Sequence, residues 1–321
     1  TIFNAGTADA QQVPVEYRIE RIPVDDGYGS YDINDLSMVV GGQRPDPSGS
    51  RVGYIYDYLG IVGAPRTVHS LDEWIPNLDG WSSAVCTGIN DAGQVVGILQ
   101  DTVDNTTIGK GFYLDLDIFS ATPTPTWQYL PTPSNSTYFY GRRINNAGDV
   151  IVPVLQDGVR RAYLFKPTNY TPHDPATDYE VLTDPDTGSP LLLDSLSLTL
   201  NDSRQVVGKL GSREGFRLTP GVVLETIPFC MFDDIAINDS GTVAFTFRTE
   251  MASNKGKKTR QVNVAARFDI QGNVQLLNDQ ASNSFDINQS GDIGMSVLNS
   301  LYLHHSNTNE DVGYGLLSLD D

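Results

Sequence analysis

The chain has 321 residues and carries 40 acidic against 21 basic residues, for a formal net charge of −19. This excess of acid argues against nucleic acid as a partner, because phosphate backbones are bound by basic faces. The 30 glycines, 18 prolines, 15 tyrosines and 12 phenylalanines favour strands and tight turns over helices. No apolar run is long enough for a transmembrane helix, so we expect no membrane-spanning segment.

The first fifteen residues, TIFNAGTADAQQVPV, are mostly small or polar, and we expect them to form a tail. Such a tail either stays without structure or docks on another copy of the chain as an assembly arm. The chain begins without a Met and without a charged and apolar leader, which is typical of a trimmed product. We therefore predict residues 1–15 as a polar tail and residues 16–321 as a single domain.

A short phrase recurs six times, and its clearest form is INDAGQVVGIL at residues 89–99. Its Asn residues lie 37 to 56 residues apart, a spacing that suits a propeller blade or an array unit. Asn, Asp and Gly tolerate the backbone of tight turns. We therefore predict a β-hairpin with its corner at 90–93, in which the Asn side chain bonds to the turn backbone. The six copies carry Asn34, Asn90, Asn145, Asn201, Asn238 and Asn288.

Two further strands are predicted after each hairpin. The first is aromatic and falls at 51–57, 109–115, 160–166, 213–219, 264–270 and 299–305. The second is short and falls at 126–132, 179–185, 222–228 and 274–280, with 68–74 as its less clear equivalent in the first copy. Four such strands cannot bury both faces alone, whereas radial packing lets each copy cover its neighbours. The sequence thus predicts an all-β fold, a six-bladed β-propeller of four-stranded antiparallel blades.

The two ends of the chain offer rival strands for closing the last blade. Residues 16–24, EYRIERIPV, resemble a fourth strand but stand before the first hairpin. Residues 313–321, GYGLLSLDD, are the alternative. If the C-terminal segment takes this position, the N-terminal strand is free to pair with a sheet edge of another copy.

The phrase IN-D/N-x-G-x-V-V-G, followed by an aromatic strand and a strand of the form L-x-x-L/P, resembles the HAF repeat of bacterial proteins. The resemblance covers residues 16–305, and GINDAGQVVG is its best copy. Other copies depart from the pattern, with Ser37 and Arg204 in place of Gly, and with Ala244 and Phe245 in place of Val and Gly. The resemblance implies a secreted or cell-surface repeat protein and transfers no catalytic residues.

A polar site is predicted near the central channel, which the first strand of each blade lines. Its candidate ligand-binding residues are Asp32, Arg142, Arg143, Asp234 and Asp286. Paired carboxylates across such a funnel would suit a polysaccharide lyase or hydrolase. The alternative is that these acids are solvated or pair with the arginines.

Calcium is a further candidate ligand, because DINQSGD resembles the start of a calcium-binding loop. Its oxygen donors are Asp286, Asn288, Ser290 and Asp292, but the bidentate Glu of such loops is missing. The same spacing also forms the repeated hairpin. Cys86 and Cys230 show no metal spacing and are either free thiols or a disulfide. No other cofactor is predicted.

Aromatic residues outside the repeat, among them Trp74, Trp81 and Trp127, either stack on sugar rings or belong to the core. The leading hypothesis is a non-enzymatic extracellular surface or matrix protein that binds proteins or glycans and self-assembles into filaments. The first alternative is a carbohydrate-active enzyme with its site at the channel. The second is a calcium-dependent adhesin.

Overall fold

The computed structural model describes fourteen stretches of the chain. They are residues 22–24, 29–44, 50–103, 106–133, 135–165, 179–193, 195, 197–211, 214–228, 230–252, 259–277, 282–297, 300–305 and 310–316. The predicted tail 1–15 lies outside them. The chain forms two compact units, Thr1–Leu130 and Pro131–Asp321.

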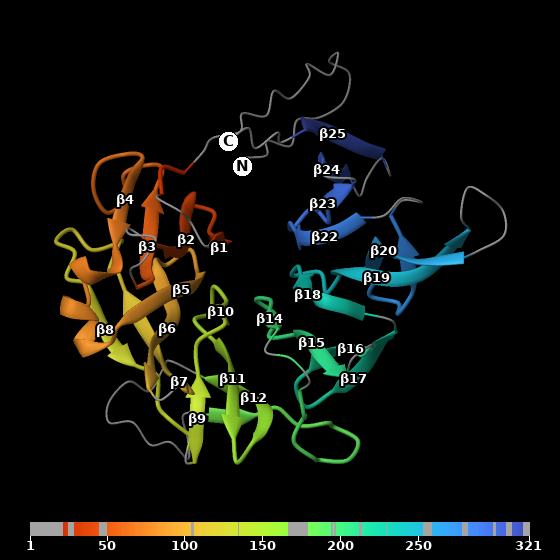
Figure 1. Cartoon of the computed structure of the whole chain (residues 1–321), viewed down its shortest axis with the longest axis horizontal. Coiled ribbons are helices and arrows are strands. Elements are labelled where there is room, and N and C mark those ends of the chain that lie inside the picture. The colour runs from red at the N-terminus through yellow and green to blue at the C-terminus, as the bar shows by residue number, and fades with distance from the viewer. Residues whose placement is uncertain are drawn as a thin grey trace. The chain divides into compact units, whose positions relative to one another are not determined.

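Unit 1 holds the first two repeats, each with four antiparallel strands (Figure 1). Repeat 1 consists of β1 (Gly29–Ile33), β2 (Met38–Gln43), β3 (Val52–Asp57) and β4 (Thr67–Ser70). Repeat 2 consists of β5 (Ser83–Ile89), β6 (Gln94–Val103), β7 (Thr106–Asp115) and β8 (Thr126–Tyr129). Two turns of 3₁₀ helix, η1 (Leu71–Glu73) and η2 (Pro76–Gly80), connect them.

Unit 2 holds the other four repeats. In repeat 3 the first strand is split into β9 (Ser136–Phe139) and β10 (Arg143–Ile144), which both pair with β11 (Val150–Gln156). The other two strands of repeat 3 are β12 (Val159–Phe165) and β13 (Tyr179–Val181). Repeat 4 consists of β14 (Leu198–Leu200), β15 (Val206–Gly211), β16 (Glu214–Thr219) and β17 (Val223–Pro228). Repeat 5 consists of β18 (Cys230–Ile237), β19 (Val243–Ala252), β20 (Thr259–Phe268) and β21 (Val274–Leu276). Repeat 6 consists of β22 (Ser282–Ile287), β23 (Ile293–Val297), β24 (Ser300–His305) and β25 (Glu310–Leu316).

The predicted all-β class is confirmed, and several repeats are separate four-stranded antiparallel sheets. The described residues contain no α-helix, and neither 3₁₀ turn has the length or apolar character needed to span a bilayer. The C-terminal segment supplies the fourth strand of repeat 6, because β25 pairs with β24 (Figure 1). The predicted closure by residues 16–24 lies mostly outside the described residues.

Successive sheets within each unit pack face to face. In unit 1 one core joins Met38 and Ile55 of repeat 1 to Val95 and Phe112 of repeat 2. The strands are therefore buried on both faces and read as continuous apolar runs rather than as alternating ones. In repeat 5, for example, neighbouring residues of β19 enter different cores: Phe245 packs toward repeat 4 and Ala244 toward repeat 6.

A glycine and an aromatic ring face each other across the second and third strands of several repeats. The pairs are Gly41 with Tyr54, Gly97 with Phe112, and Gly208 with Phe216. A methyl group added to Gly97 would lie 2.7 Å from the Phe112 ring and 2.1 Å from the Val85 carbonyl oxygen. The glycine of the repeated phrase thus leaves room for the aromatic ring of the next strand.

Repeat 5 reverses these sizes, which explains its departure from the phrase. Phe245 stands at the glycine position and faces Ala266 in place of an aromatic residue. Both residues are fully buried, so the pair keeps one large and one small side chain. The sequence alone showed the exchange at Phe245 but not the compensating Ala266.

We predict that this pair is energetically coupled. Phe245→Gly should lower the free energy of unfolding by about 3–5 kcal/mol through a cavity, and Ala266→Phe by about 1–3 kcal/mol through overpacking. The double variant rebuilds the arrangement of the other repeats and should be more stable than the sum of the two losses, by about 1–3 kcal/mol. Urea denaturation of the four proteins measures the coupling, and strict additivity would contradict it.

Candidate functional site

The Asn of the repeated phrase closes its own hairpin, as predicted. In repeat 2, Asn90 Oδ1 accepts the backbone N–H groups of Ala92 and Gln94 at 3.1 and 3.0 Å. The equivalent bond to the residue four positions later recurs in every repeat, at 2.7–3.0 Å. The side-chain oxygen therefore fixes the corner through which the first strand enters the second.

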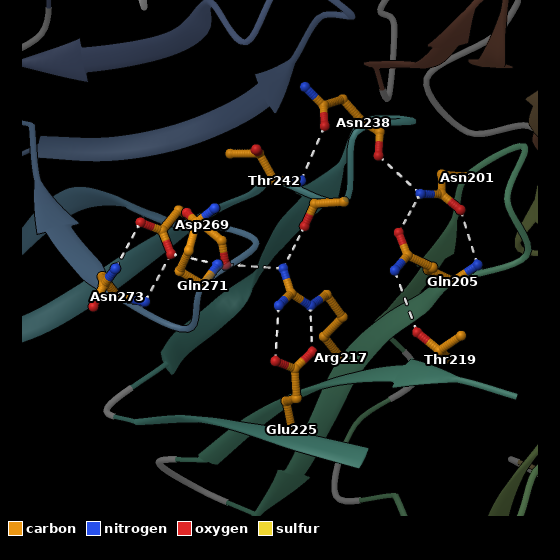
Figure 2. A network of polar contacts seen from close by, with 11 residues as sticks. Asn201, Gln205, Arg217, Thr219, Glu225, Asn238, Thr242, Asp269, Gln271 and Asn273 are labelled. Atoms are coloured by element: carbon orange, nitrogen blue, oxygen red, sulfur yellow. Dashed lines mark hydrogen bonds and ion pairs between the residues drawn. The ribbon is translucent and has the colours of Figure 1, made fainter. Parts of the chain in front are cut away.

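The amide nitrogen of the same side chain reaches the neighbouring repeat. In unit 1, Asn34 Nδ2 donates to the backbone carbonyl of Asn90 at 2.9 Å. In unit 2 the same contact runs from Asn145 to Asn201 at 3.1 Å, from Asn201 to Asn238 at 2.8 Å, and from Asn238 to Asn288 at 3.1 Å. Figure 2 shows the Asn201–Asn238 link together with Gln205, whose backbone Asn201 also binds. We call this series the asparagine relay.

A second series of bonds runs beside the asparagine relay. The backbone N–H of Asp35 donates to Asp91 Oδ1 at 2.8 Å, and that of Asp202 donates to Asp239 Oδ1 at 2.8 Å. Asn146 and Asp239 make the same contact, to Asp202 Oδ1 at 2.7 Å and to Gln289 Oε1 at 2.9 Å. Both polar residues of the phrase thus join one repeat to the next, so their recurrence is explained by architecture.

A buried arginine adds a third link between repeats 4 and 5. The Arg217 guanidinium, with 2% of the residue exposed, binds both carboxylate oxygens of Glu225 at 2.7 and 2.9 Å (Figure 2). It also donates to the backbone carbonyls of Gly241 at 2.5 Å and Asp269 at 3.0 Å, and lies over the Phe268 ring. The bidentate geometry is one that arginine forms and lysine does not. Because these partners all belong to repeats 4 and 5, the contact serves to join the two repeats.

The turn that receives Arg217 is itself held by Asp269. Its carboxylate accepts the N–H groups of Gln271 and Asn273 and the Asn273 side-chain amide (Figure 2). Because these donors stabilise the ionised form, the pKa of Asp269 is lowered, with the Asn273 bonds as the main cause.

The predicted channel residues are partly brought together. Arg143 of β10 lies close enough to Asp286 for its charge to favour the ionised carboxylate. Asp286 is exposed on the surface of the chain, and its carboxylate accepts the N–H of Ile287 at 2.9 Å. Arg142 is half-buried and donates its backbone N–H to Ile151.

The two other channel residues stand differently. Asp32, in unit 1, accepts the backbone N–H of Ile89 at 3.1 Å and so links β1 to β5. Asp234 belongs to β18, and its side chain lies outside the described residues. Their role in a channel site stays a prediction.

The candidate calcium residues occupy the hairpin of repeat 6. Asn288 Oδ1 accepts the Asp292 N–H at 2.8 Å, and Asn288 Nδ2 donates to Asp292 Oδ2 at 3.2 Å. Asp286 precedes this pair and accepts the N–H of Ile287, and Ser290 lies between the two residues in sequence. The described residues contain no group of three or more acidic, His or Cys side chains placed to hold a metal. Asp286, Asn288 and Asp292 are therefore engaged in hydrogen bonds within the chain, and calcium binding stays a prediction.

Of the two cysteines, which are either free thiols or a disulfide by sequence, the structure describes the side chain of one. Cys86 is a buried free thiol, and burial raises its pKa far above the usual range. The Cys230 side chain lies outside the described residues.

A polar and aromatic cluster in unit 1 lies outside the repeated phrase, and we call it the Tyr129 cluster. The Tyr129 hydroxyl donates to the Asp79 carboxylate and accepts the Trp81 indole N–H at 2.9 Å. The Lys110 ammonium lies 3.6 Å from the Tyr129 ring centroid, and the Trp127 ring meets Tyr129 edge-on at 5.3 Å. Burial and the bond to Asp79 raise the pKa of Tyr129.

Sequence reasoning named the tryptophans of this cluster but missed Asp79, Lys110 and Tyr129. Trp127 and Tyr129 are two residues apart on β8 and hence share a face, which their spacing alone predicts. The approach of Asp79 depends on η2, where Asn77, Leu78 and Asp79 all have left-handed backbone angles, with φ of 50°, 48° and 51°. No sequence pattern predicted that turn.

Comparison with known proteins adds little to this description. No family model and no curated protein matches the chain. Among solved structures, the chain is similar to the crystal structure of Porphyromonas gingivalis dipeptidyl peptidase 4, with a TM-score of 0.48 and 9% sequence identity. The match covers 88% of this chain and 44% of that one, so the chain spans less than half of that protein. The resemblance to the HAF repeat stays a prediction.

The asparagine relay makes a specific prediction for Asn201. In Asn201→Asp the carboxylate can still accept the Gln205 N–H, but it cannot donate to the Asn238 carbonyl and repels it. We expect a loss of about 1–3 kcal/mol in the free energy of unfolding. The matched control is Asn263→Asp in β20, which makes the same change of charge outside the relay. Equal losses in the two variants would contradict the role of the relay.

Proposed function

We propose that this protein is a non-enzymatic extracellular surface or matrix protein that binds protein or glycan partners. In this proposal the six repeats form one six-bladed propeller, secreted or displayed at a cell surface. The main support for this proposal is that the recurrent polar residues and the variable connections have different roles. The recurrent Asn and Asp side chains link repeats to one another, which leaves the variable connections to contact partners.

The contact made by one candidate channel carboxylate supports a structural role over catalysis. Asp32 accepts a backbone N–H from a neighbouring repeat, as a structural carboxylate does. One feature favours the enzyme alternative: Asp286 lies near the Arg143 guanidinium, and a carboxylate with a charged partner is common at active sites. The enzyme hypothesis is therefore kept as the competitor, with Asp286 as its acid.

We expect the protein to release no new chain ends from polysaccharides. The measurement incubates the full chain with laminarin, xylan, mannan, starch and polygalacturonate, and follows reducing ends and unsaturated products. Release of ends by the protein, abolished by Asp286→Asn and retained in the matched variant Asp292→Asn, would contradict the proposal and support the enzyme. A chelator added to the same samples tests the adhesin alternative, since calcium dependence would appear as a lower melting temperature.

Self-assembly through residues 1–15 is a separate part of the proposal. Light scattering should show a mass that rises with concentration for the full chain and stays at that of a monomer once residues 1–15 are removed. A full chain that remains monomeric at high concentration would remove filament formation from the proposal.

A further inference from the structure

The Tyr129 cluster sits where an edge strand meets the connection between repeats 1 and 2. Trp127 and Tyr129 lie on β8, the outer strand of repeat 2, directly opposite Leu114 and Phe112 of β7. Those two inner residues are fully buried in the core of unit 1. The face that forms the core therefore continues onto β8, where its aromatic rings become half-exposed.

Asp79 is brought to this face by a strained turn. Leu78 is buried in the core and anchors η2, while Asp79 beside it is exposed. Three successive non-glycine residues with left-handed angles cost about 1–2 kcal/mol each. Strain of this kind persists where the surrounding structure enforces it, and it concentrates at functional positions.

The cluster keeps hydrogen-bonding capacity that its internal contacts do not use. Tyr129 occupies Asp79 Oδ2, and within the described part of the chain Asp79 Oδ1 has no hydrogen bond. The same is true there of the Lys110 ammonium, which contacts only the Tyr129 ring, and of the Trp127 indole N–H. The exposed edge of the cluster thus offers one charged acceptor and two donors beside aromatic rings.

This combination matches the chemistry of a sugar. A pyranose ring has a face of C–H groups, which the negative face of an aromatic ring attracts, and hydroxyls that both donate and accept. Asp79 and Lys110 carry opposite charges, so the cluster itself adds no net charge. The whole chain has a net charge of −19 and repels polyanions.

We propose that the Tyr129 cluster binds a neutral saccharide chain, with Trp127 stacking on a sugar ring and Asp79 accepting its hydroxyls. This inference rests on the proposed function and names one ligand class and one site for it. Lys110 donates to a neighbouring hydroxyl, and Trp81 positions Tyr129 through the indole N–H bond.

The test uses the full chain and five neutral hexasaccharides: cellohexaose, xylohexaose, mannohexaose, maltohexaose and laminarihexaose. Calorimetry and intrinsic tryptophan fluorescence should detect saturable binding of at least one of them. Asp79→Asn, which keeps the shape of the side chain, and Trp127→Ala should each weaken that binding about tenfold or more. Phe119→Ala is the matched control, because Phe119 is an exposed aromatic residue (78%) on the turn between β7 and β8, outside the cluster.

Thermal melting of each variant separates loss of binding from loss of folding, and Trp127→Phe is the substitute if Trp127→Ala unfolds. The inference is overturned if no hexasaccharide binds at millimolar concentration, or if Asp79→Asn binds as well as the parent chain. Self-assembly or protein binding without saccharide binding would leave the proposed function standing. Cleavage of a bound hexasaccharide would overturn the proposed function and leave the site standing.

Discussion

The side-chain amide of asparagine is the group on which the arrangement of the repeats depends. Its oxygen is a hydrogen-bond acceptor and its nitrogen is a donor, and both take part in the fold. Oδ1 closes the hairpin of its own repeat, while Nδ2 binds the carbonyl of the next Asn in the series. Aspartate lacks the donor, and serine lacks the reach and the second group. The same side chain therefore makes one bond within its own hairpin and one bond to the neighbouring repeat, which couples the two.

Two further contacts strengthen this coupling. In several repeats an aromatic ring of the third strand fills the space next to a glycine of the second strand, and in repeat 5 the sizes are exchanged between Phe245 and Ala266. Between repeats 4 and 5, Arg217 joins its own sheet to two turns of the next. Polar and apolar residues of the phrase thus serve the same purpose, which is to fix one repeat against another.

Much of the fold followed from sequence, because local rules fix its elements. The hairpin corners, the aromatic third strands and most short fourth strands depend on turn chemistry and strand composition within a few residues. The relay between Asn201 and Asn238, the bonds of Arg217 and the left-handed turn at Asp79 depend on residues that packing brings together. Among the candidate site residues, Arg143 lies near Asp286, and the role of all five in ligand binding stays a prediction. Of the Tyr129 cluster, the sequence indicated only the tryptophans.

Amide hydrogen exchange measures the links between repeats most directly. The N–H groups of Asp202 and Asp239 lie in surface turns, and a carboxylate and a glutamine of the next repeat accept them. The equivalent N–H of Gln289 has no acceptor within the described residues and is an internal reference. We expect slow exchange at Asp202 and Asp239, fast exchange at Gln289, and faster exchange at Asp202 in Asp239→Ala. Equally fast exchange at all three amides in the unsubstituted chain would contradict this expectation.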